Sequence, residues 1–350
     1  MRHFLYAAAA GALMVGSALA AQNAPANPPP PASNSGQVAV SLPTSLPDAG
    51  LVTPMTVDQS ARLMLPVRIN GAGPFPFIVD TGAERTVLSR EVAQQLNLPV
   101  VGRARVVGMA EAVETNLVAP GDLGLEHLTL ETGDVPTFSQ FNIGAPGLIG
   151  IDSLQGHKVV IDFVAQRIDI RPSEARRQQR REESFDDDAI TVIARSRGGR
   201  MILSNASIDG HRVDIIVDTG GQASVGNLAL QRLVQRTQRH PNGLTPGELR
   251  TVTGGTLAVQ RSQIERISVG GVDFTALPVA YADSPAFTEL GLGRRPALLL
   301  GMDALRLFDR IAVDFANRRV TFDLPDGARR DNAQRYAARE MPRVLTIAAR

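Results

Sequence analysis

The sequence contains no cysteine and no tryptophan, and only 4% of its 350 residues are aromatic. The absence of cysteine excludes disulfide bonds, thiol catalysis, thiolate metal sites and a lipid anchor attached to cysteine. Histidine is also scarce, and its five positions show no pair at the spacing typical of zinc ligands, so we expect no metal site. The five histidines are His3, His127, His157, His211 and His240.

The chain also lacks a large net charge. The 36 basic and 35 acidic residues leave a net charge of +1 at pH 7, which gives no electrostatic reason to expect nucleic acid or an anionic surface as a partner. The composition, 43% hydrophobic and 20% charged, is that of a globular protein, and the length allows two domains of ordinary size. Beyond the N-terminal region, no apolar run is long enough to cross a membrane.

The N-terminus has the parts of an export signal. Arg2 and His3 supply a positive start, an apolar run follows, and Ala18-Leu19-Ala20 forms a cleavage site of small residues. We therefore predict a signal peptide over residues 1–20 and export to the periplasm of a bacterial cell envelope; an uncleaved membrane anchor is the alternative. Residues 21–50 are rich in proline and small polar residues, which predicts a flexible linker.

Two parts of the chain repeat one pattern of predicted elements. Residues 63–69 predict a strand, Asn70-Gly71 predicts a hairpin turn, and a second apolar strand leads into Asp80. A short helix is predicted after the aspartate, with Ser89 as its N-cap.

The second copy follows the same order. Residues 201–208 predict the first strand, Asp209-Gly210 the turn, and an apolar strand leads into Asp218. The following helix has Asn227 as its expected N-cap. Both copies also end alike, with two aliphatic residues, a glycine, an aspartate two places later, and two further strands.

Short runs rich in valine, isoleucine and leucine dominate the repeat and predict a mostly β chain. We expect two lobes, residues 51–172 and 188–325, each within the usual range of domain sizes. A solvated, mixed-charge linker would join them at 173–187. The tail, 326–350, is polar and rich in arginine, and we expect a surface helix or a partly disordered segment there.

One aspartate stands directly after an apolar strand in each copy, in Asp80-Thr81-Gly82 and in Asp218-Thr219-Gly220. Burying an unpaired charge is costly, so two carboxylates at equivalent places need a shared reason. One interpretation is a duplicated turn in which each aspartate caps local N–H groups. A turn needs neither the threonine nor the distal aliphatic-aliphatic-glycine unit, however, and these favour a paired catalytic site.

These motifs resemble those of the aspartic peptidases, specifically the retropepsin-like group. The resemblance covers both copies and implies two tandem β-barrel lobes with pseudo-two-fold symmetry. One chain would then supply both halves of the site, so we expect a monomer; pairing of like lobes from two chains is an alternative. The matching residues are Asp80-Thr81-Gly82-Ala83, Thr86-Val87-Leu88, Leu148-Ile149-Gly150, Asp218-Thr219-Gly220 and Leu299-Leu300-Gly301.

Hydrolysis of an amide without a metal or a covalent nucleophile needs an activated water and a proton for the carbonyl oxygen. Two carboxyl groups that share one proton provide both, because they cannot both ionise comfortably. The resemblance therefore implies Asp80 and Asp218 as catalytic residues, a protein or peptide substrate, and no cofactor. The pair titrates as a unit, so which aspartate acts as the base stays open.

The resemblance also implies support for this pair. Threonines would hydrogen-bond across the lobes, glycines would allow close backbone approach, and the distal glycine segments would pass beneath the loops. The family usually has alanine or serine after the second Asp-Thr-Gly, so Gly221 predicts a looser loop in the second lobe. The supporting residues are Thr81, Gly82, Ala83, Thr219, Gly220, Gly221, Gly150 and Gly301.

Retropepsin-like enzymes cover the substrate with a flap hairpin, and residues 106–116 and 251–259 are the candidates here. Both mix polar, apolar and glycine residues, and ordinary hairpins are the alternative interpretation. Neither contains tyrosine, which favours the retropepsin-like over the pepsin-like comparison. The residues expected to take part in substrate binding are Gly108, Met109, Gly254 and Gly255.

Other functions stay open at this point. A catalytically silent protein that binds peptides on the same fold is the main alternative to an aspartic endopeptidase. An envelope protein attached through its proline-rich arm is a further one. Ser224 gives no support for a serine hydrolase, because GQASVG misses the G-x-S-x-G spacing. The intact aspartates in both copies favour the endopeptidase.

Overall fold

The computed structural model describes residues 52–54, 56–57, 62–126, 128–173, 189–238, 243–325, 335–337 and 346–349. The predicted signal peptide and proline-rich linker lie outside the described residues, as does the charged linker apart from Ser173. Among the helices in these ranges, none is long and apolar enough to cross a membrane.

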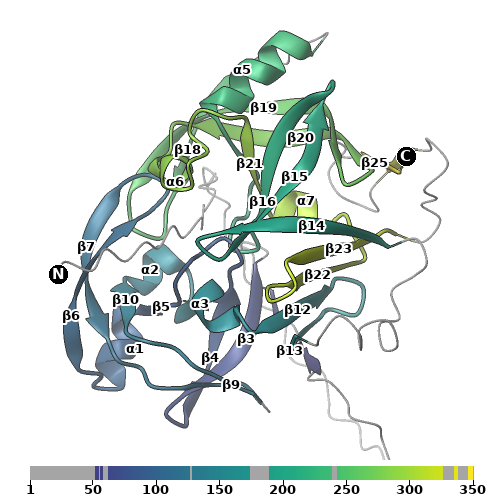
Figure 1. Ribbon diagram of the computed structural model, residues 1–350. Coiled ribbons are helices and arrows are strands. Elements are labelled where there is room, and N and C mark those ends of the chain that lie inside the picture. Colours follow the sequence, from purple (N-terminus) through teal and green to yellow (C-terminus); the bar gives the residue numbers. More distant parts are fainter. Residues whose placement is uncertain are drawn as a thin grey trace, which may run out of the picture.

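Two curled sheets build two mostly β lobes (Figure 1), which confirms the predicted fold class. The sheet of the first lobe has ten strands in the described part of the chain, in the order β6-β7-β10-β5-β11-β4-β3-β8-β9 with β2 beside β3. Its elements are β2 (Thr56–Val57), β3 (Leu63–Ile69), β4 (Ala72–Val79), β5 (Val87–Ser89), α1 (Arg90–Gln95), β6 (Val100–Val107), β7 (Ala112–Val118), β8 (Leu123–Gly124), β9 (Thr129–Leu130), β10 (Val135–Phe138), α2 (Gln140–Ile143), β11 (Gly147–Ile149) and α3 (Ile151–Leu154).

The second sheet has 15 strands among the described residues, and 13 of them follow the order β1-β13-β12-β22-β23-β14-β15-β16-β21-β17-β20-β19-β18. Its elements are β1 (Val52–Pro54), β12 (His157–Asp162), β13 (Arg167–Pro172), β14 (Ile190–Arg197), β15 (Arg200–Ile208), β16 (His211–Val217), β17 (Val225–Asn227), α5 (Leu228–Thr237), β18 (Thr245–Arg250), β19 (Thr256–Val269), β20 (Val272–Ala282), α6 (Pro285–Glu289), β21 (Ala297–Leu300), α7 (Met302–Leu305), β22 (Arg310–Asp314), β23 (Arg319–Asp323), β24 (Arg335–Ala337) and β25 (Thr346–Ala349).

Both predicted hairpins form with the turn chemistry that the sequence indicated. Asn70 and Gly71 have φ values of 49° and 81°, and Asp209 and Gly210 have 47° and 79°. Two successive residues with positive φ are typical of the tight turn that suits the right-handed twist of paired strands. In each lobe, one later strand pairs with the same two partners. Strand β11 runs parallel to β4 and antiparallel to β5, and strand β21 runs parallel to β16 and antiparallel to β17.

The last strands of the first copy join the sheet of the second lobe. Strand β12 pairs antiparallel with β22, and β23 continues the sheet into β14. Val159 and Val313 are register partners in this pairing, and both belong to one apolar cluster that extends through the two lobes. Strand pairing therefore also holds the two lobes together.

The C-terminal tail differs from the surface helix or disordered segment that we expected. Within the tail, residues 335–337 and 346–349 form the strands β24 and β25, and β25 pairs antiparallel with residues 272–275 of β20. The tail is short and polar, but the edge of β20 offers unpaired backbone groups that such a segment can use. This partner is distant in sequence, which explains why local composition did not predict it.

The N-cap residues of α1 and α5 differ in the hydrogen bonds of their side chains, so we expect different losses of stability when each is replaced. The Ser89 hydroxyl accepts the Val92 N–H at 3.1 Å, so Ser89→Ala should lower the free energy of unfolding by about 1 kcal/mol. The Asn227 Oδ1 accepts the Leu230 N–H at 2.8 Å, and its Nδ2 donates to the carbonyls of Leu292 and Arg295.

Asn227→Ala should therefore cost about 2–3 kcal/mol, because it also removes the hydrogen bonds to the carbonyls of Leu292 and Arg295. Urea unfolding of the two variants beside the wild type measures the difference. Equal losses would show that the two extra hydrogen bonds of Asn227 contribute nothing to stability.

Candidate active site

Asp80 and Asp218 occupy equivalent positions, each one residue beyond the end of a strand, β4 or β16. Both are buried, with 1% and 2% of their surface exposed. Their backbone N–H groups donate to the carbonyls of Ile149 and Leu300, with N–O distances of 3.0 Å in both cases. The distal unit of each copy therefore fixes the backbone of its own aspartate.

Each carboxylate is also held by the turn that follows it, because one of its oxygens accepts two backbone N–H groups. Such bonds stabilise the charged form of a buried carboxyl group. The loop at Gly221 makes the same bonds as the loop at Ala83, so these contacts give no sign of the looser second loop that we expected. The donors to Asp80 Oδ1 are Gly82 (2.8 Å) and Ala83 (2.9 Å), and the donors to Asp218 Oδ1 are Gly220 (3.1 Å) and Gly221 (3.0 Å).

Thr81 and Thr219 cross between the lobes. The Thr81 hydroxyl donates to the Val217 carbonyl at 2.8 Å and accepts the Thr219 N–H at 3.2 Å. The Thr219 hydroxyl donates to the Val79 carbonyl at 2.6 Å and accepts the Thr81 N–H at 3.1 Å. Because all four bonds are buried and link residues from opposite lobes, the two loops form one unit.

Each carboxyl group lies directly against the glycine of the opposite loop. A Cβ added at Gly82 would lie 2.6 Å from Asp218 Oδ1, and one added at Gly220 would overlap the carboxyl carbon of Asp80. These positions require glycine because any side chain would enter the space that the carboxyl groups occupy. The contact also shows that the two loops bring the two carboxyl groups close together.

Burial raises the pKa of both carboxyl groups. Desolvation is the largest cause for Asp218, and the neighbouring charge of Asp80 raises its pKa further, well above the usual range. Desolvation also raises the pKa of Asp80, opposed by the N–H groups of Gly82 and Ala83. Such a pair keeps one proton over a wide range of pH. Across the described ranges, no group of three or more His, Asp or Glu side chains is placed to hold a metal ion.

A further pair of contacts, which the motifs did not predict, braces the loops. In the first lobe, Asp152 Oδ1 accepts both the N–H and the hydroxyl of Thr86 at 2.8 Å. In the second lobe, the carboxylate of Asp303 accepts the N–H of Ser224 at 2.9 Å and its hydroxyl at 2.6 Å. The same bracing therefore occurs twice, with a threonine in one copy and a serine in the other.

Gly150 and Gly301 lie between these groups. Their N–H groups donate to the bracing hydroxyls at 3.0 Å and 3.1 Å. A Cβ at Gly301 would lie 2.6 Å from the carbonyl carbon of Ala223, and one at Gly150 would overlap the backbone of Arg85. The distal segments thus pass directly beneath the two loops, and only glycine fits there.

The sequence did contain a signal for Asp152 and Asp303, because each stands two places after the distal glycine in its copy. Ser224 lacks the spacing of a nucleophile, and the structure shows that its side chain instead braces the second loop. Burial raises the pKa of Asp303 to about 6, although Ser224 and nearby N–H groups stabilise its charged form.

An ion pair beside the first loop involves a charged residue that is replaced by an uncharged one in the second loop. Arg200, buried on β15, donates from Nε to the Gly82 carbonyl at 2.7 Å, and its Nη1 lies 3.3 Å from Glu84 Oε2. Its counterpart at the start of the first copy, Arg62, donates to a carbonyl of its own lobe at 2.8 Å. Gln222 stands in the second loop where Glu84 stands in the first. The second lobe thus places a positive charge against the first loop.

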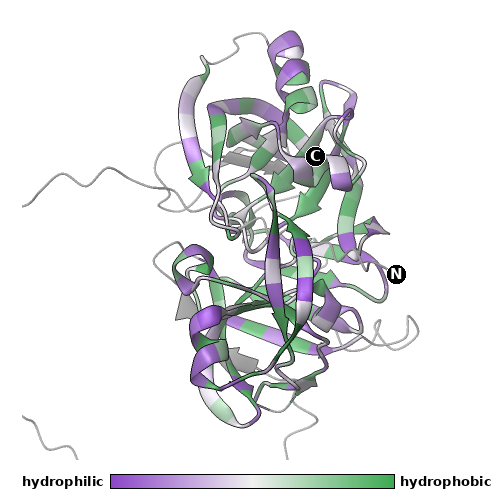
Figure 2. Ribbon diagram, turned by 90° about the vertical axis from the view of Figure 1, so that its left-hand side faces the viewer, coloured by the Kyte–Doolittle hydropathy of each residue, from purple (hydrophilic) through white to green (hydrophobic). Residues whose placement is uncertain are grey.

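The two flap candidates are hairpins whose tips meet. The first tip connects β6 and β7, and Figure 2 shows this hairpin reaching from one lobe to the other; the second tip connects β18 and β19. A Cβ added at Gly108 would lie 2.7 Å from the Thr253 side chain, and one at Gly255 would lie 2.6 Å from Glu111 Oε1. The tips are therefore in direct contact.

Each tip also buries one apolar side chain in the opposite lobe. Met109, 1% exposed, packs in a cluster of the second lobe that includes Ile216, two residues before the aspartate. Val252, also 1% exposed, packs in a cluster of the first lobe that includes Ile78. The Ser284 hydroxyl donates to the Met109 carbonyl at 2.6 Å. Both flap candidates thus end above the strands that carry the aspartates.

Helix α2 of the first lobe receives the second tip. A Cβ added at Gly254 would lie 2.6 Å from Asn142 Nδ2. The guanidinium of Arg250, on β18, lies 4.8 Å from the ring centroid of Phe141, a distance at which a cation and an aromatic face attract. Phe141 is 71% exposed, so this ring is available at the surface beside the tip.

The raised pKa of Asp303 predicts how stability depends on pH. Its pKa is about 6 in the folded protein, above the ordinary value of 3.8 for an aspartate, so the unfolded chain releases this proton first as the pH rises. The group therefore stabilises the fold fully below pH 4, and this contribution, up to about 3 kcal/mol, is lost by about pH 6.

Asp303→Asn should remove this slope, because asparagine does not titrate. Unfolding by denaturant at several pH values between 4 and 7, for the variant and the wild type, measures it. The contributions of Asp80 and Asp218 are common to both proteins and cancel in the difference. Parallel stability curves for the two proteins would contradict the raised pKa.

Comparison with known proteins agrees with this geometry. Residues 65–156 match the sequence model of the gag-polyprotein aspartyl protease family, and residues 204–304 match that of the aspartyl protease family. The DNA damage-inducible protein 1 of Kluyveromyces lactis is 31% identical over 115 residues, and that of Saccharomyces cerevisiae is 30% identical over 112 residues. These matches cover 32% of this chain and 27% and 26% of the two yeast proteins.

Each of the two family matches contains one Asp-Thr-Gly motif and the distal glycine of the same copy. The repeat in the sequence and the two lobes of the structure thus correspond to two protease domains in one chain. This protein belongs to the aspartyl protease family, in its retropepsin-like form, and carries two such domains in tandem.

Proposed function

We propose that this protein is an aspartic endopeptidase that hydrolyses peptide bonds with a water activated by Asp80 and Asp218. The observation that supports this most is the pairing of two buried carboxyl groups, one from each lobe, by the crossed hydrogen bonds of Thr81 and Thr219. A duplicated structural turn would not need that pairing, and it would not bring two carboxyl groups together at the cost of burying both.

The proposed reaction uses the single proton that the pair retains. The ionised carboxylate takes a proton from a water molecule, and the water oxygen attacks the carbonyl carbon of the peptide bond. The protonated carboxyl group gives its proton to the carbonyl oxygen, so that a neutral tetrahedral diol forms. The pair then gives its proton to the amide nitrogen and takes one from a hydroxyl group of the diol. The carbon–nitrogen bond breaks to give a carboxylic acid and an amine, and the pair again holds one proton. We assign the two roles to the pair, because it titrates as a unit.

The substrate would lie extended between the aspartates and the two flap tips. Extended peptides bind beside strands through main-chain hydrogen bonds, with specificity from side-chain pockets. Met109 and Val252 occupy apolar clusters on either side of the pair, so the tips would have to lift before substrate side chains could enter. Opening of such lids can limit the rate of turnover.

We also propose that the protein is exported and that it works as a monomer. The predicted signal peptide supports secretion to the periplasm, where the chain from residue 21 onward would work. A monomer is supported by the presence of both aspartates in one chain and by the pairing of β12 with β22, which joins the lobes within that chain.

Removing either carboxylate should abolish hydrolysis. Asp80→Asn and Asp218→Asn should each lower kcat by about 10³-fold or more, since the loss of one member leaves no base or no acid. The chain 21–350 would be incubated with a mixture of unfolded peptides, and new termini would be identified by mass spectrometry. Asp209→Asn is the matched control, because this aspartate lies exposed in a turn where asparagine fits equally well.

Unchanged cleavage in either dyad variant would overturn the mechanism. If the folded wild type binds peptides with saturation but yields no products, the silent peptide-binding alternative would replace the endopeptidase.

The pH dependence of kcat/KM should be bell-shaped, because the pair works only when it holds one proton. Activity should fall at low pH as both groups protonate and at high pH as both ionise. The raised pKa of Asp218 places the high-pH limb well above the usual range for an aspartate. A profile that only rises toward alkaline pH would indicate a different catalytic base.

A further inference from the structure

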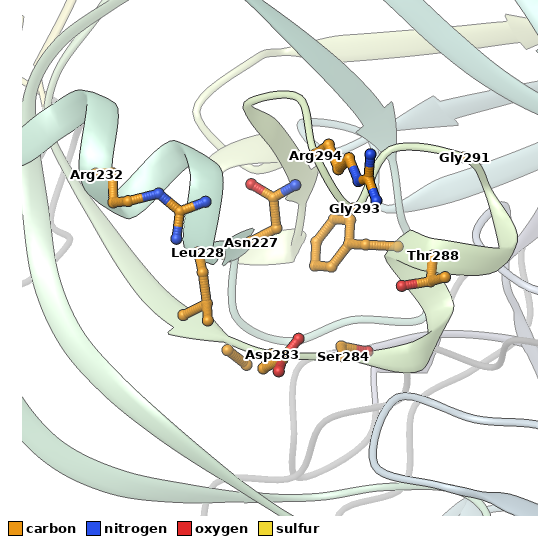
Figure 3. Close-up of a pocket in the computed structure, with 11 residues that line it drawn as sticks. Asn227, Leu228, Arg232, Asp283, Ser284, Thr288, Gly291, Gly293 and Arg294 are labelled. Carbon is orange, nitrogen blue, oxygen red and sulfur yellow. The ribbon is translucent and has the colours of Figure 1, made fainter.

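A cavity of about 430 Å³ lies on the second lobe between α5 and α6 (Figure 3). This volume is within the range of sites that hold small ligands or side chains. Leu228 and Phe287 give it an apolar wall, and Arg232 and Arg294 line it with guanidinium groups from two different elements. The catalytic proposal above makes no use of any of these residues.

The walls of the cavity are fixed before any ligand arrives. Asn227, at the start of α5, donates through Nδ2 to the carbonyls of Leu292 and Arg295 at 2.8 Å and 2.7 Å. These bonds tie the loop that carries Arg294 to the helix that carries Arg232. The two guanidinium groups are therefore presented by elements that cannot easily move apart.

The charges of the cavity are not balanced. Arg232 and Arg294 are exposed, and neither forms an ion pair or a hydrogen bond with any residue in the described part of the chain. Asp283 is the single acidic residue among those that line the cavity, which leaves a net charge of +1. Guanidinium groups suit carboxylates in both charge and geometry.

The equivalent helix of the first lobe carries a carboxylate near its start. Between α1 and α2, the carboxylate of Glu91 accepts the N–H of Gln140 at 2.8 Å and the hydroxyl of Ser139 at 3.3 Å. Counted from the helix caps Ser89 and Asn227, the residue that corresponds to Glu91 is Ala229. The second lobe thus lacks the carboxylate that the first lobe supplies from its own chain.

The cavity also borders the proposed cleft. Ser284, which lines it, donates to the Met109 carbonyl at the tip of the first flap candidate. Phe287 lines the cavity and packs in the same apolar cluster as Met109. A peptide that leaves the cleft beside this tip would therefore pass over the cavity.

We propose that this cavity is a subsite that binds a carboxylate of the peptide substrate between Arg232 and Arg294. The carboxylate is either the side chain of an acidic residue or the free C-terminus of the peptide. The inference rests on the proposed function and adds a preference in substrate class: peptides with a negative group on one side of the cleaved bond.

The cleavage sites themselves test the subsite. In the peptide mixture, the wild type should show about three- to tenfold enrichment of acidic residues or of chain ends at one fixed distance from the cleaved bond. Arg232→Gln with Arg294→Gln should remove the enrichment, and Arg232→Glu with Arg294→Glu should replace it with a preference for basic residues. Cleavage of peptides that have no acidic residue and an amidated C-terminus should not change.

Arg236→Glu is the matched control, because this arginine lies in the last turn of the same helix and does not line the cavity. It should keep the preference of the wild type. If the wild type shows no preference for acidic residues or for chain ends at a fixed distance, or if the reversed variant keeps the wild-type preference, the subsite is wrong while the endopeptidase stands.

A second measurement separates the subsite from turnover. The Asp218→Asn chain, immobilised, would be exposed to a random pool of short peptides, once with free and once with amidated C-termini. Enrichment of acidic residues in both pools supports a side-chain carboxylate, and stronger retention of the free than of the amidated pool, whatever the side chains, supports the C-terminus. Equal retention of acidic and neutral peptides together with equal retention of the two pools, or no change when Arg232→Glu and Arg294→Glu are added, overturns the proposal even if no peptide is ever cleaved.

Discussion

Two buried carboxyl groups have to lie close together where the loops of the two lobes meet, and most features of the structure follow from the cost of that arrangement. Desolvation disfavours both charges, and each charge disfavours the other. Two backbone N–H groups of each loop partly offset this cost for each aspartate. Glycines in both loops are required because the carboxyl groups occupy the space that a side chain would fill.

Such an arrangement needs rigid support, and both copies provide it in the same way. Thr81 and Thr219 join the loops to each other, and the carboxylates of Asp152 and Asp303 brace each loop from below. The lobes are connected again by the pairing of β12 with β22 and by the exchange of apolar side chains between flap tips and lobes. The pair of aspartates is thus held by contacts between the loops, by the bracing carboxylates, and by the contacts that join the lobes.

Because both copies lie in one chain, they can differ, and the differences are local. Arg200 pairs with Glu84, whereas Gln222 stands at the corresponding place in the second loop. Glu91 bridges two helices in the first lobe, whereas Ala229 stands at the corresponding position in the second. A dimer of identical subunits could not place a charge on one side only.

Much of the fold could be predicted because it depends on short-range patterns that occur twice. The hairpins at Asn70 and Asp209, the caps at Ser89 and Asn227, and the strands before the aspartates all follow from neighbouring residues. The strands of the tail could not be predicted, because β25 needs the edge of β20, more than sixty residues earlier in the chain. The looser loop at Gly221 was expected from one residue alone, and its hydrogen bonds give no sign of it.

The sequence by itself determined that the chain carries two matching units with one aspartate, one threonine and the required glycines each, because these depend on residue type and spacing. Only the tertiary structure decided which groups meet. It set Arg200 against the first loop, placed Met109 in the second lobe, and left Arg232 and Arg294 around an open cavity. The physical reason is that hydrogen bonds and packing between distant residues depend on how the lobes dock. The local sequence around each residue does not determine that docking.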